Sequence, residues 1–302
     1  MDLEIPEDVI AFVRGAFGSC NQQLANDLST FPAIHEESLD MNFISNFARH
    51  QAPVRLPSNW IVRIDAHFIG GGRHFGTWEV ADIGLMMVFR KEGKVVKSKI
   101  CLLQSKKLYA SPLAVLPENP YFRRAGLGRL LVSEGEHASI IEDKLLAFKK
   151  TSRYQAFRKG SDQQDTMGHF ERRWSTEMYY LFYNPVCLPL SVQMPLQNSP
   201  DLPANDIGCR VVQKRQLDDV IAERPRGYSP SFSDLEKGLG PEDQGVPSKG
   251  GWRLEDFAAD LVLKCKAGLV DESPNFESLA ILMNQKQRPM SCALSITFDI
   301  RE

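Results

Sequence analysis

Apolar residues recur at two different spacings along the chain, and the change between them marks out the predicted elements. Residues 7–28 carry apolar side chains at helical spacing, in two stretches that separate near residue 20, so we expect an N-terminal helical segment over residues 1–34. Residues 60–107 alternate or form short apolar runs broken by turns, which predicts consecutive strands. Helices followed by strands, a further helix and another strand favour an α/β fold with a mixed sheet.

A second helix is predicted just before these strands, in the sequence HEESLDMNFISNFARH. Leu39, Phe43 and Phe47 stand four residues apart there, which is the spacing of an amphipathic helix that faces a core. Glu36 and Glu37 come at the N-terminal end of this helix. Negative charge there interacts favourably with the helix dipole, and this explains the two residues as well as a functional role does.

The later part of the chain is predicted to alternate helices, strands and one long loop. Residues 140–157 show helical spacing, and residues 178–185 are typical of a short buried strand. Residues 223–251 are rich in Gly, Pro and Ser, which predicts a long surface loop. Residues 254–265 have the pattern of an amphipathic helix, and residues 291–300 alternate as a strand with one buried face.

Composition places the chain among ordinary globular proteins. Hydrophobic residues make up 43% and charged residues 25% of its 302 residues, and the formal net charge is -2. The six cysteines are scattered and form no CxxC pair, which indicates reduced thiols and argues against a structural zinc. No segment has the character of a membrane span or a secretory signal. We therefore expect a cytoplasmic protein without membrane association, whose contacts with any nucleic acid depend on local basic groups.

Three polar residues at the ends of two predicted strands carry the candidate chemistry. Asp82 opens the run DIGLMMVF, whereas Gln104 and Lys106 close the run KICLLQSKK after a KEGK turn. If these runs pair as a hairpin about that turn, the three side chains meet, and the residue between Gln104 and Lys106 points away. Phosphodiester hydrolysis uses a hard cation with oxygen ligands. The trio therefore predicts a metal site in which Gln104 supplies an amide oxygen and Lys106 orients the attacking water.

These residues resemble the PD-(D/E)XK nuclease superfamily, in the Mrr-like variant in which Gln replaces the acidic residue of the motif. The resemblance covers about residues 35–185. It implies a restriction-endonuclease-like mixed sheet flanked by helices, and hydrolysis of nucleic acid, DNA in the first place, with Mg²⁺ or Mn²⁺. Restriction-type members of the superfamily suggest a role in defence against foreign DNA. A partner subunit and a homo-oligomer both stay open.

The resemblance also implies that a Glu from the helix before the strands completes the metal site with Asp82 and Gln104. The matching position is Glu37, and its neighbour Glu36 is the alternative. Glu79 is a further candidate, because it closely precedes the first strand residue of the site.

Basic residues near the proposed site are candidates for contact with substrate. A GGG turn precedes Arg73 and His74, and Arg73 is able to grip a phosphate there, although a tight turn explains the glycines equally well. Lys107 follows the QxK motif and is a third candidate. Basic residues also gather over residues 90–107 and 149–173, where a solvated surface explains them as well as phosphate contact does.

We therefore expect a nuclease-like core over residues 35–195 and a C-terminal α/β extension over residues 196–302 that packs on it. The alternative is a protein that keeps this fold without activity and binds nucleic acid or a partner protein, because Gln104 brings no negative charge to a metal. Metal binding without cleavage distinguishes this alternative from an active nuclease.

Overall fold

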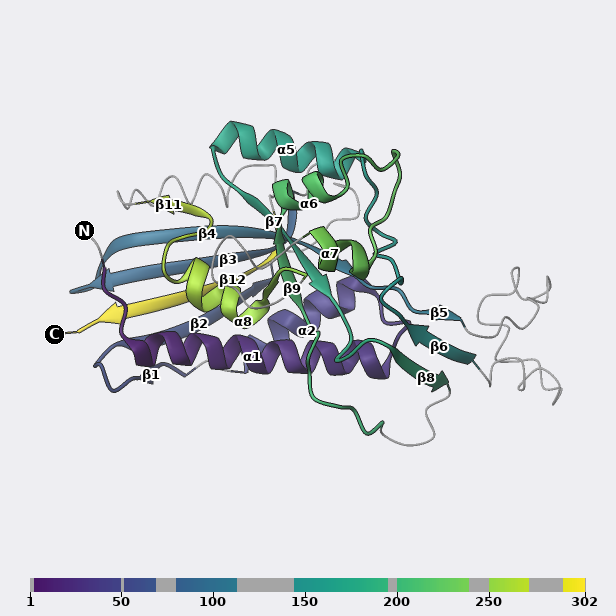
Figure 1. The fold of residues 1–302 in the computed structure, drawn as a ribbon. Helices are drawn as coiled ribbons and strands as arrows, with labels where there is room; N and C mark the ends of the chain where they lie inside the picture. The colour runs from purple at the N-terminus through teal and green to yellow at the C-terminus, as the bar shows by residue number, and fades with distance from the viewer. Residues whose placement is uncertain are drawn as a thin grey trace.

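A large mixed β-sheet organises the part of the chain that the computed structural model describes, which is residues 3–49, 52–68, 80–112, 144–194, 200–238, 250–271 and 290–301 (Figure 1). In order across the sheet, the strands are β1 (Val54–Arg55), β2 (Ile61–Phe68), β12 (Met290–Ile300), β3 (Ala81–Lys91), β4 (Lys94–Lys107), β7 (Met178–Tyr183), β9 (Arg210–Gln213) and β10 (Trp252–Arg253), and β11 (Leu269–Asp271) also pairs with β4. A smaller sheet contains β5 (Ser111–Pro112), β6 (Lys144–Phe148) and β8 (Leu190–Met194). The predicted α/β class is confirmed.

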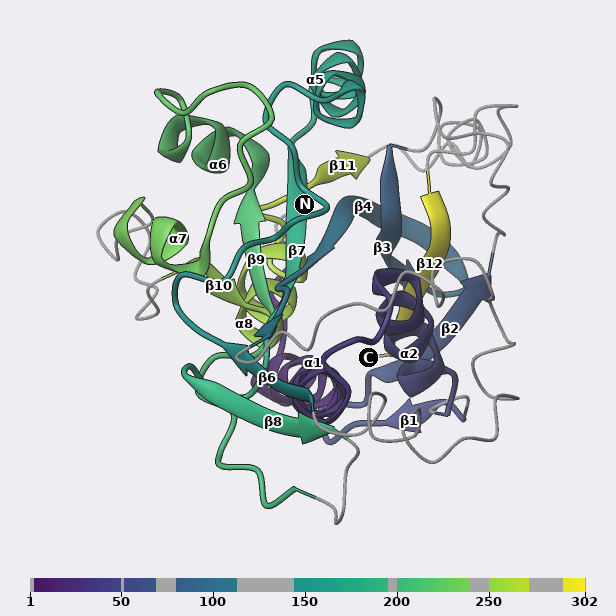
Figure 2. The ribbon, with the colours of Figure 1, turned by 90° about the vertical axis from the view of Figure 1, so that its right-hand side faces the viewer.

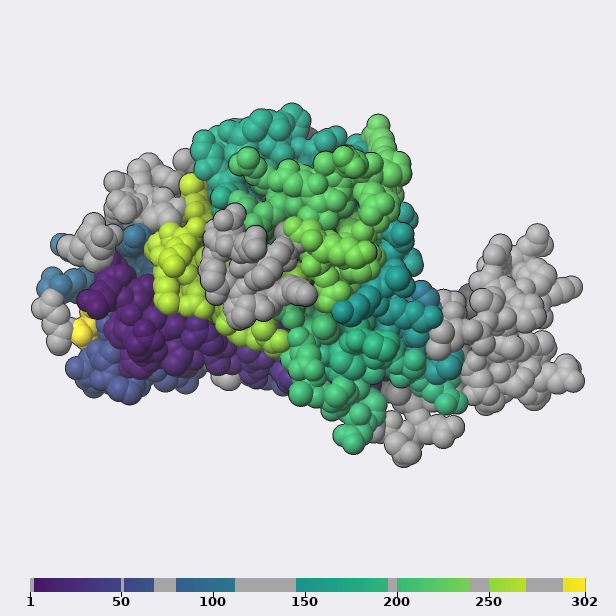
Figure 3. Space-filling view, viewed as in Figure 1, coloured from purple at the N-terminus to yellow at the C-terminus, as the bar shows by residue number. Residues whose placement is uncertain are grey.

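Helices lie on both faces of the main sheet. They are α1 (Glu7–Thr30), α2 (Glu36–Ala48), α5 (Asp162–Trp174), α6 (Lys214–Val220), α7 (Phe232–Gly238), α8 (Leu254–Asp256) and the π-helical turn η3 (Phe257–Val262). Figure 1 shows α1 and α2 on one face and α5 and α6 on the other. In the space-filling view, α8 packs directly along α1 (Figure 3). Within the described residues, no helix combines the length and the apolar character that crossing a membrane requires.

Three phenylalanines join α1 to α2. Phe17 lies with its ring centroid 4.7 Å from that of Phe47, and the rings of Phe43 and Phe47 are 5.3 Å apart. All three side chains are fully buried, and α2 contacts β2, β12 and β4 beneath them. This cluster therefore anchors the C-terminal half of α2 against α1 and the strands.

The hairpin of β3 and β4 has the predicted pairing. Ile83 lies opposite Leu103, and the turn residues Glu92 and Gly93 have φ of 52° and 76°. Two residues with positive φ give the turn a twist that suits a tight hairpin. The register brings the beginning of β3, which contains Asp82, beside the end of β4.

The C-terminal part of the chain lies inside the main sheet. β12 pairs antiparallel with β2 and parallel with β3, so that Leu294 lies between Ala66 and Leu85 (Figure 2). Residues 290–300, which the sequence placed in an extension that packs on the core, are therefore a central strand of the main sheet. Both faces of β12 are largely buried, not one as predicted.

Several local predictions are also corrected. Residues 7–30 form one helix without a break near residue 20, because Cys20 and Leu24 continue the buried stripe. Residues 144–148 form a strand instead of the helix predicted over residues 140–157, since they pair with β8. The helix of this region is α5, whose few buried residues leave a weak apolar pattern. The predicted loop contains α7, and its residues 239–249 lie outside the described part of the chain.

Replacement of Phe43 by Ala is expected to lower the free energy of unfolding by about 3–5 kcal/mol, because it leaves a cavity between α1, α2 and the sheet. Denaturation in urea measures the change. Phe31→Ala is the matched control, since Phe31 is 50% exposed and its removal should change stability by less than about 0.5 kcal/mol. Equal effects of the two substitutions would contradict the role given to the cluster.

Candidate functional site

Asp82 and Gln104 meet at the end of the sheet where β3 begins and β4 ends. The side-chain amide of Gln104 donates a hydrogen bond from Nε2 to Asp82 Oδ2. Gln104 is only 1% exposed, and its Oε1 is buried without a hydrogen-bond partner among the described residues. A buried polar atom without a partner costs about 1–3 kcal/mol. Oε1 is therefore an oxygen for which a ligand such as a hard cation would be favourable.

Ser105 also belongs to this site, contrary to the prediction that its side chain points away. Its backbone N–H and its hydroxyl lie 2.8 and 2.9 Å from Asp82 Oδ2. The ladder between β3 and β4 ends at the pair Ile83 and Leu103. Beyond that pair, where the pairing with β3 has ended, the Ser105 N–H donates to the side-chain carboxylate of Asp82.

Lys106 is held by Glu36, the first residue of α2. Its Nζ lies 3.1 Å from Glu36 Oε1 and 2.6 Å from the carbonyl oxygen of Ser105, and Lys106 is 3% exposed. Glu36 Oε2 accepts the backbone N–H of Lys107 at 2.7 Å. Asp82 and Gln104 are therefore in contact, whereas Lys106, two residues further along β4, pairs with a carboxylate of α2.

Glu36 takes the place that was predicted for Glu37. Glu37 is exposed, whereas Glu36 reaches the end of β4. Successive residues of an α-helix point about 100° apart, so only one of two neighbours can face the strand end. Burial raises the pKa of Glu36, and the nearby charge of Lys106 acts in the opposite direction.

Lys107 was predicted to contact substrate, but in the structure its side chain makes contacts within the protein. Its amine donates to the carbonyl oxygens of Pro32 and Ile34 and lies 4.7 Å from the centroid of the Tyr109 ring. Burial lowers the pKa of Lys107. Lys107 therefore fastens the loop between α1 and α2 to β4, which helps to position Glu36.

Three other predicted residues, Arg73, His74 and Glu79, lie outside the described residues. The basic group over residues 149–173 is largely engaged within the protein. Arg153 donates to the carbonyl oxygen of Ser229 at 2.5 Å, for example.

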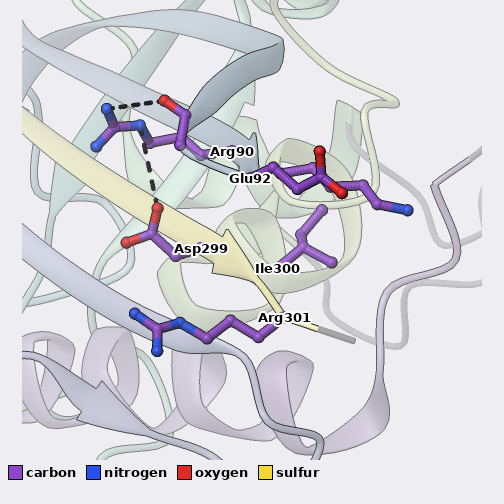
Figure 4. A pocket seen from close by; sticks show the side chains of 7 residues that line it. Arg90, Glu92, Asp299, Ile300 and Arg301 are labelled. Atoms are coloured by element: carbon purple, nitrogen blue, oxygen red, sulfur yellow. Dashed lines mark hydrogen bonds and ion pairs between the residues drawn. The ribbon is translucent and has the colours of Figure 1, made fainter.

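A hollow of about 600 Å³ lies at the opposite end of β3 from Asp82 (Figure 4). It is lined by Arg90, Lys91, Glu92, Gly93, Asp299, Ile300 and Arg301. The guanidinium of Arg90 lies 4.0 Å from the carboxylate of Asp299 and donates to the carbonyl oxygen of Gly93. The hollow is therefore separate from the candidate site.

Asp40 was missed by the sequence analysis, although it lies beside the site. It follows Glu36 by one helical turn, and its carboxyl group contacts the hydroxyls of Ser105 and Tyr183 at 3.0 and 2.7 Å. Tyr183 comes from β7, which pairs in parallel with the end of β4. An acidic residue next to Leu39, inside an otherwise apolar stripe, was the signal that could have revealed Asp40.

The donor atoms at this site suit Mg²⁺ or Mn²⁺. Asp82 and Glu36 supply carboxylates and Gln104 supplies the unpartnered Oε1, and such cations take oxygen ligands and keep several waters. Within the described residues, no three His, Cys, Asp or Glu side chains form a group that could hold a metal ion. A cation at this site would therefore need the Gln104 oxygen in addition to the carboxylates.

A scan against protein-family models, a search of curated proteins and a search of solved structures each returned no match for this chain. The functional assignment therefore depends on the residues of the site.

Replacement of Glu36 by Gln is expected to weaken Mn²⁺ binding by about tenfold or more, because it removes one of two carboxylates from the site. Glu37→Gln is the matched control, and its affinity should equal that of the wild type. Isothermal titration calorimetry measures both. A larger loss in the Glu37 variant than in the Glu36 variant would restore the original prediction.

Proposed function

We propose that this protein is a metal-dependent nuclease that hydrolyses phosphodiester bonds of nucleic acid, with DNA as the substrate that the sequence resemblance favours. The observation that supports this most strongly is that Gln104 contacts Asp82 and Lys106 contacts Glu36 near the end of one strand, where Gln104 Oε1 lacks a partner among the described residues. Carboxylates, an amide oxygen and a lysine amine are the groups that such a reaction uses.

Asp82, Gln104 and Glu36 would hold Mg²⁺ or Mn²⁺ in this proposal. When bound, the cation polarises a phosphoryl oxygen and lowers the pKa of a water. Lys106 supplies positive charge at the same strand end, where it offsets the charge that develops on the phosphate and orients the attacking water. The carbonyl of Ser105 and the carboxylate of Glu36 hold the Lys106 amine in place before substrate binds.

A second function, binding of nucleic acid or a partner protein without cleavage, is favoured by one observation. Lys106 is 3% exposed and already paired with Glu36, so its amine must become accessible before it contacts a phosphate. A site that binds Mn²⁺ and never exposes this amine would bind without cutting.

Lys106→Ala is expected to lower the rate of metal-dependent cleavage by about 100-fold or more, because it removes the charge that stabilises the transition state. Purified protein is incubated with supercoiled plasmid and with single-stranded DNA and RNA, in Mg²⁺, Mn²⁺ or EDTA, and the products are separated on gels. Lys94→Ala is the control, since Lys94 is an exposed lysine at the other end of the same strand.

Undiminished cleavage by the Lys106 variant would show that the assignment is wrong. If the wild type binds Mn²⁺ and cleaves none of these substrates, the second function replaces the first.

A further inference from the structure

Asp40 is a buried acid for which the proposed reaction has no direct use. It lies on the face of α2 that covers the sheet and is 9% exposed. Its Oδ1 accepts the hydroxyl of Tyr183 at 2.7 Å, and its Oδ2 lies 3.0 Å from Ser105 Oγ. Both oxygens are therefore engaged with neighbouring hydroxyls.

The Ser105 hydroxyl lies between two carboxyl groups. Its Oγ is 3.0 Å from Asp40 Oδ2 and 2.9 Å from Asp82 Oδ2. A hydroxyl carries one proton and donates one hydrogen bond at a time. If both Asp40 and Asp82 were ionised, the Ser105 hydroxyl could donate its proton to only one of them. Its oxygen would then lie against the other carboxylate oxygen with no proton between the two atoms. A proton on Asp40 Oδ2 satisfies both contacts.

The surroundings of Asp40 favour that proton. The groups that face it are Glu36 on its own helix, Asp82 on β3, Tyr183 on β7 and Cys292 on β12. Burial raises the pKa of Asp40 well above its usual range, and the negative charges of Asp82 and Glu36 act in the same direction. The hydrogen bond that Tyr183 donates acts against this shift in the pKa.

We propose that Asp40 is a positioning residue that carries a proton and fixes the carboxylate of Asp82 through the hydroxyl of Ser105. Tyr183 donates to Asp40, Asp40 donates to Ser105, and Ser105 donates to Asp82. This chain of hydrogen bonds joins β7, α2, β4 and β3 at the point where Asp82 meets Gln104. Its effect on cleavage rests on the proposed function, whereas its effect on the metal-free protein does not.

Asp40→Asn preserves this arrangement, because the amide nitrogen donates to Ser105 and the amide oxygen accepts from Tyr183. Asp40→Ala removes it and should weaken Mn²⁺ binding and lower kcat by about 10–100-fold, with little change in KM. The Asn variant should recover most of this loss. Asp40→Leu fills the same space without making hydrogen bonds. It replaces Asp40→Ala in these measurements if the Ala variant folds poorly.

Ser105→Ala interrupts the same chain one step nearer to Asp82. It should lower Mn²⁺ affinity about as much as Asp40→Ala does, and the double variant should lose little more than either single one.

The metal-free protein gives a readout that needs no activity. Because the pKa of Asp40 is raised on folding, the folded chain holds this proton more tightly than the unfolded chain. The contribution of Asp40 to stability is therefore present below about pH 4 and is lost as the pH rises towards the folded pKa. The side chain of the Asp40→Asn variant cannot ionise. As the pH rises from about 4 towards the folded pKa of Asp40, the free energy of unfolding of this variant in EDTA should therefore increase relative to that of the wild type. The infrared spectrum of the wild type should also contain a protonated-carboxyl band that the Asn variant lacks.

Equal impairment of the Asn and Ala variants in Mn²⁺ affinity, or absence of the protonated-carboxyl band, would overturn the proposal. Wild-type Mn²⁺ affinity in the Ala and Leu variants would overturn it as well. If the wild type cleaves no substrate but the Asn variant still recovers Mn²⁺ affinity and the stability trend holds, the proposed nuclease function fails and the role of Asp40 stands.

Discussion

The hydrogen bonds accepted by Asp82 Oδ2 decide how the candidate site is built. The Gln104 amide, the Ser105 N–H and the Ser105 hydroxyl all meet this one oxygen. They exist because the ladder of β3 and β4 stops one residue before Asp82. A slip of one residue in that register would turn Gln104 and Lys106 to the other face of the sheet and separate them from Asp82. The tight turn at Glu92 and Gly93, at the far end of the hairpin, therefore controls the chemistry of this end.

Helix α2 brings two acids to the same place, and burying them is unfavourable unless they are paired. Glu36 is compensated by the amine of Lys106 and the N–H of Lys107, and Asp40 by two hydroxyls. The apolar contacts of Phe43 and its neighbours stabilise the same helix and offset part of this penalty. The N-terminal half of α2 thus supplies acids to the candidate site, whereas its C-terminal half supplies aromatic rings to the hydrophobic core.

The hairpin and the contact of Asp82 with Gln104 could be predicted from sequence because they depend on local features, a two-residue turn and the alternation of side chains along the strands. Other parts depend on distant contacts. No spacing in the chain indicates that β12 inserts between β2 and β3, since residues 290–300 are far from both in sequence. The choice of Glu36 over Glu37 depends on the residue at which α2 begins, which pattern analysis does not resolve. The role of Ser105 was missed because its contacts reach Asp82 and also Asp40 of α2, which the pairing of strands does not reveal.

Glu36 has two roles in the proposed mechanism, as a ligand of the cation and as the counter-ion of Lys106. One carboxylate cannot satisfy both partners fully, because the negative charge that it gives to a divalent cation is no longer available to the amine. A cation held by Glu36 would therefore weaken the hold of this carboxylate on Lys106. The amine is buried and paired in the metal-free chain, and it would meet a phosphate only after such a release. In this proposal, the competition for Glu36 is thus what separates cleavage of nucleic acid from binding without cleavage.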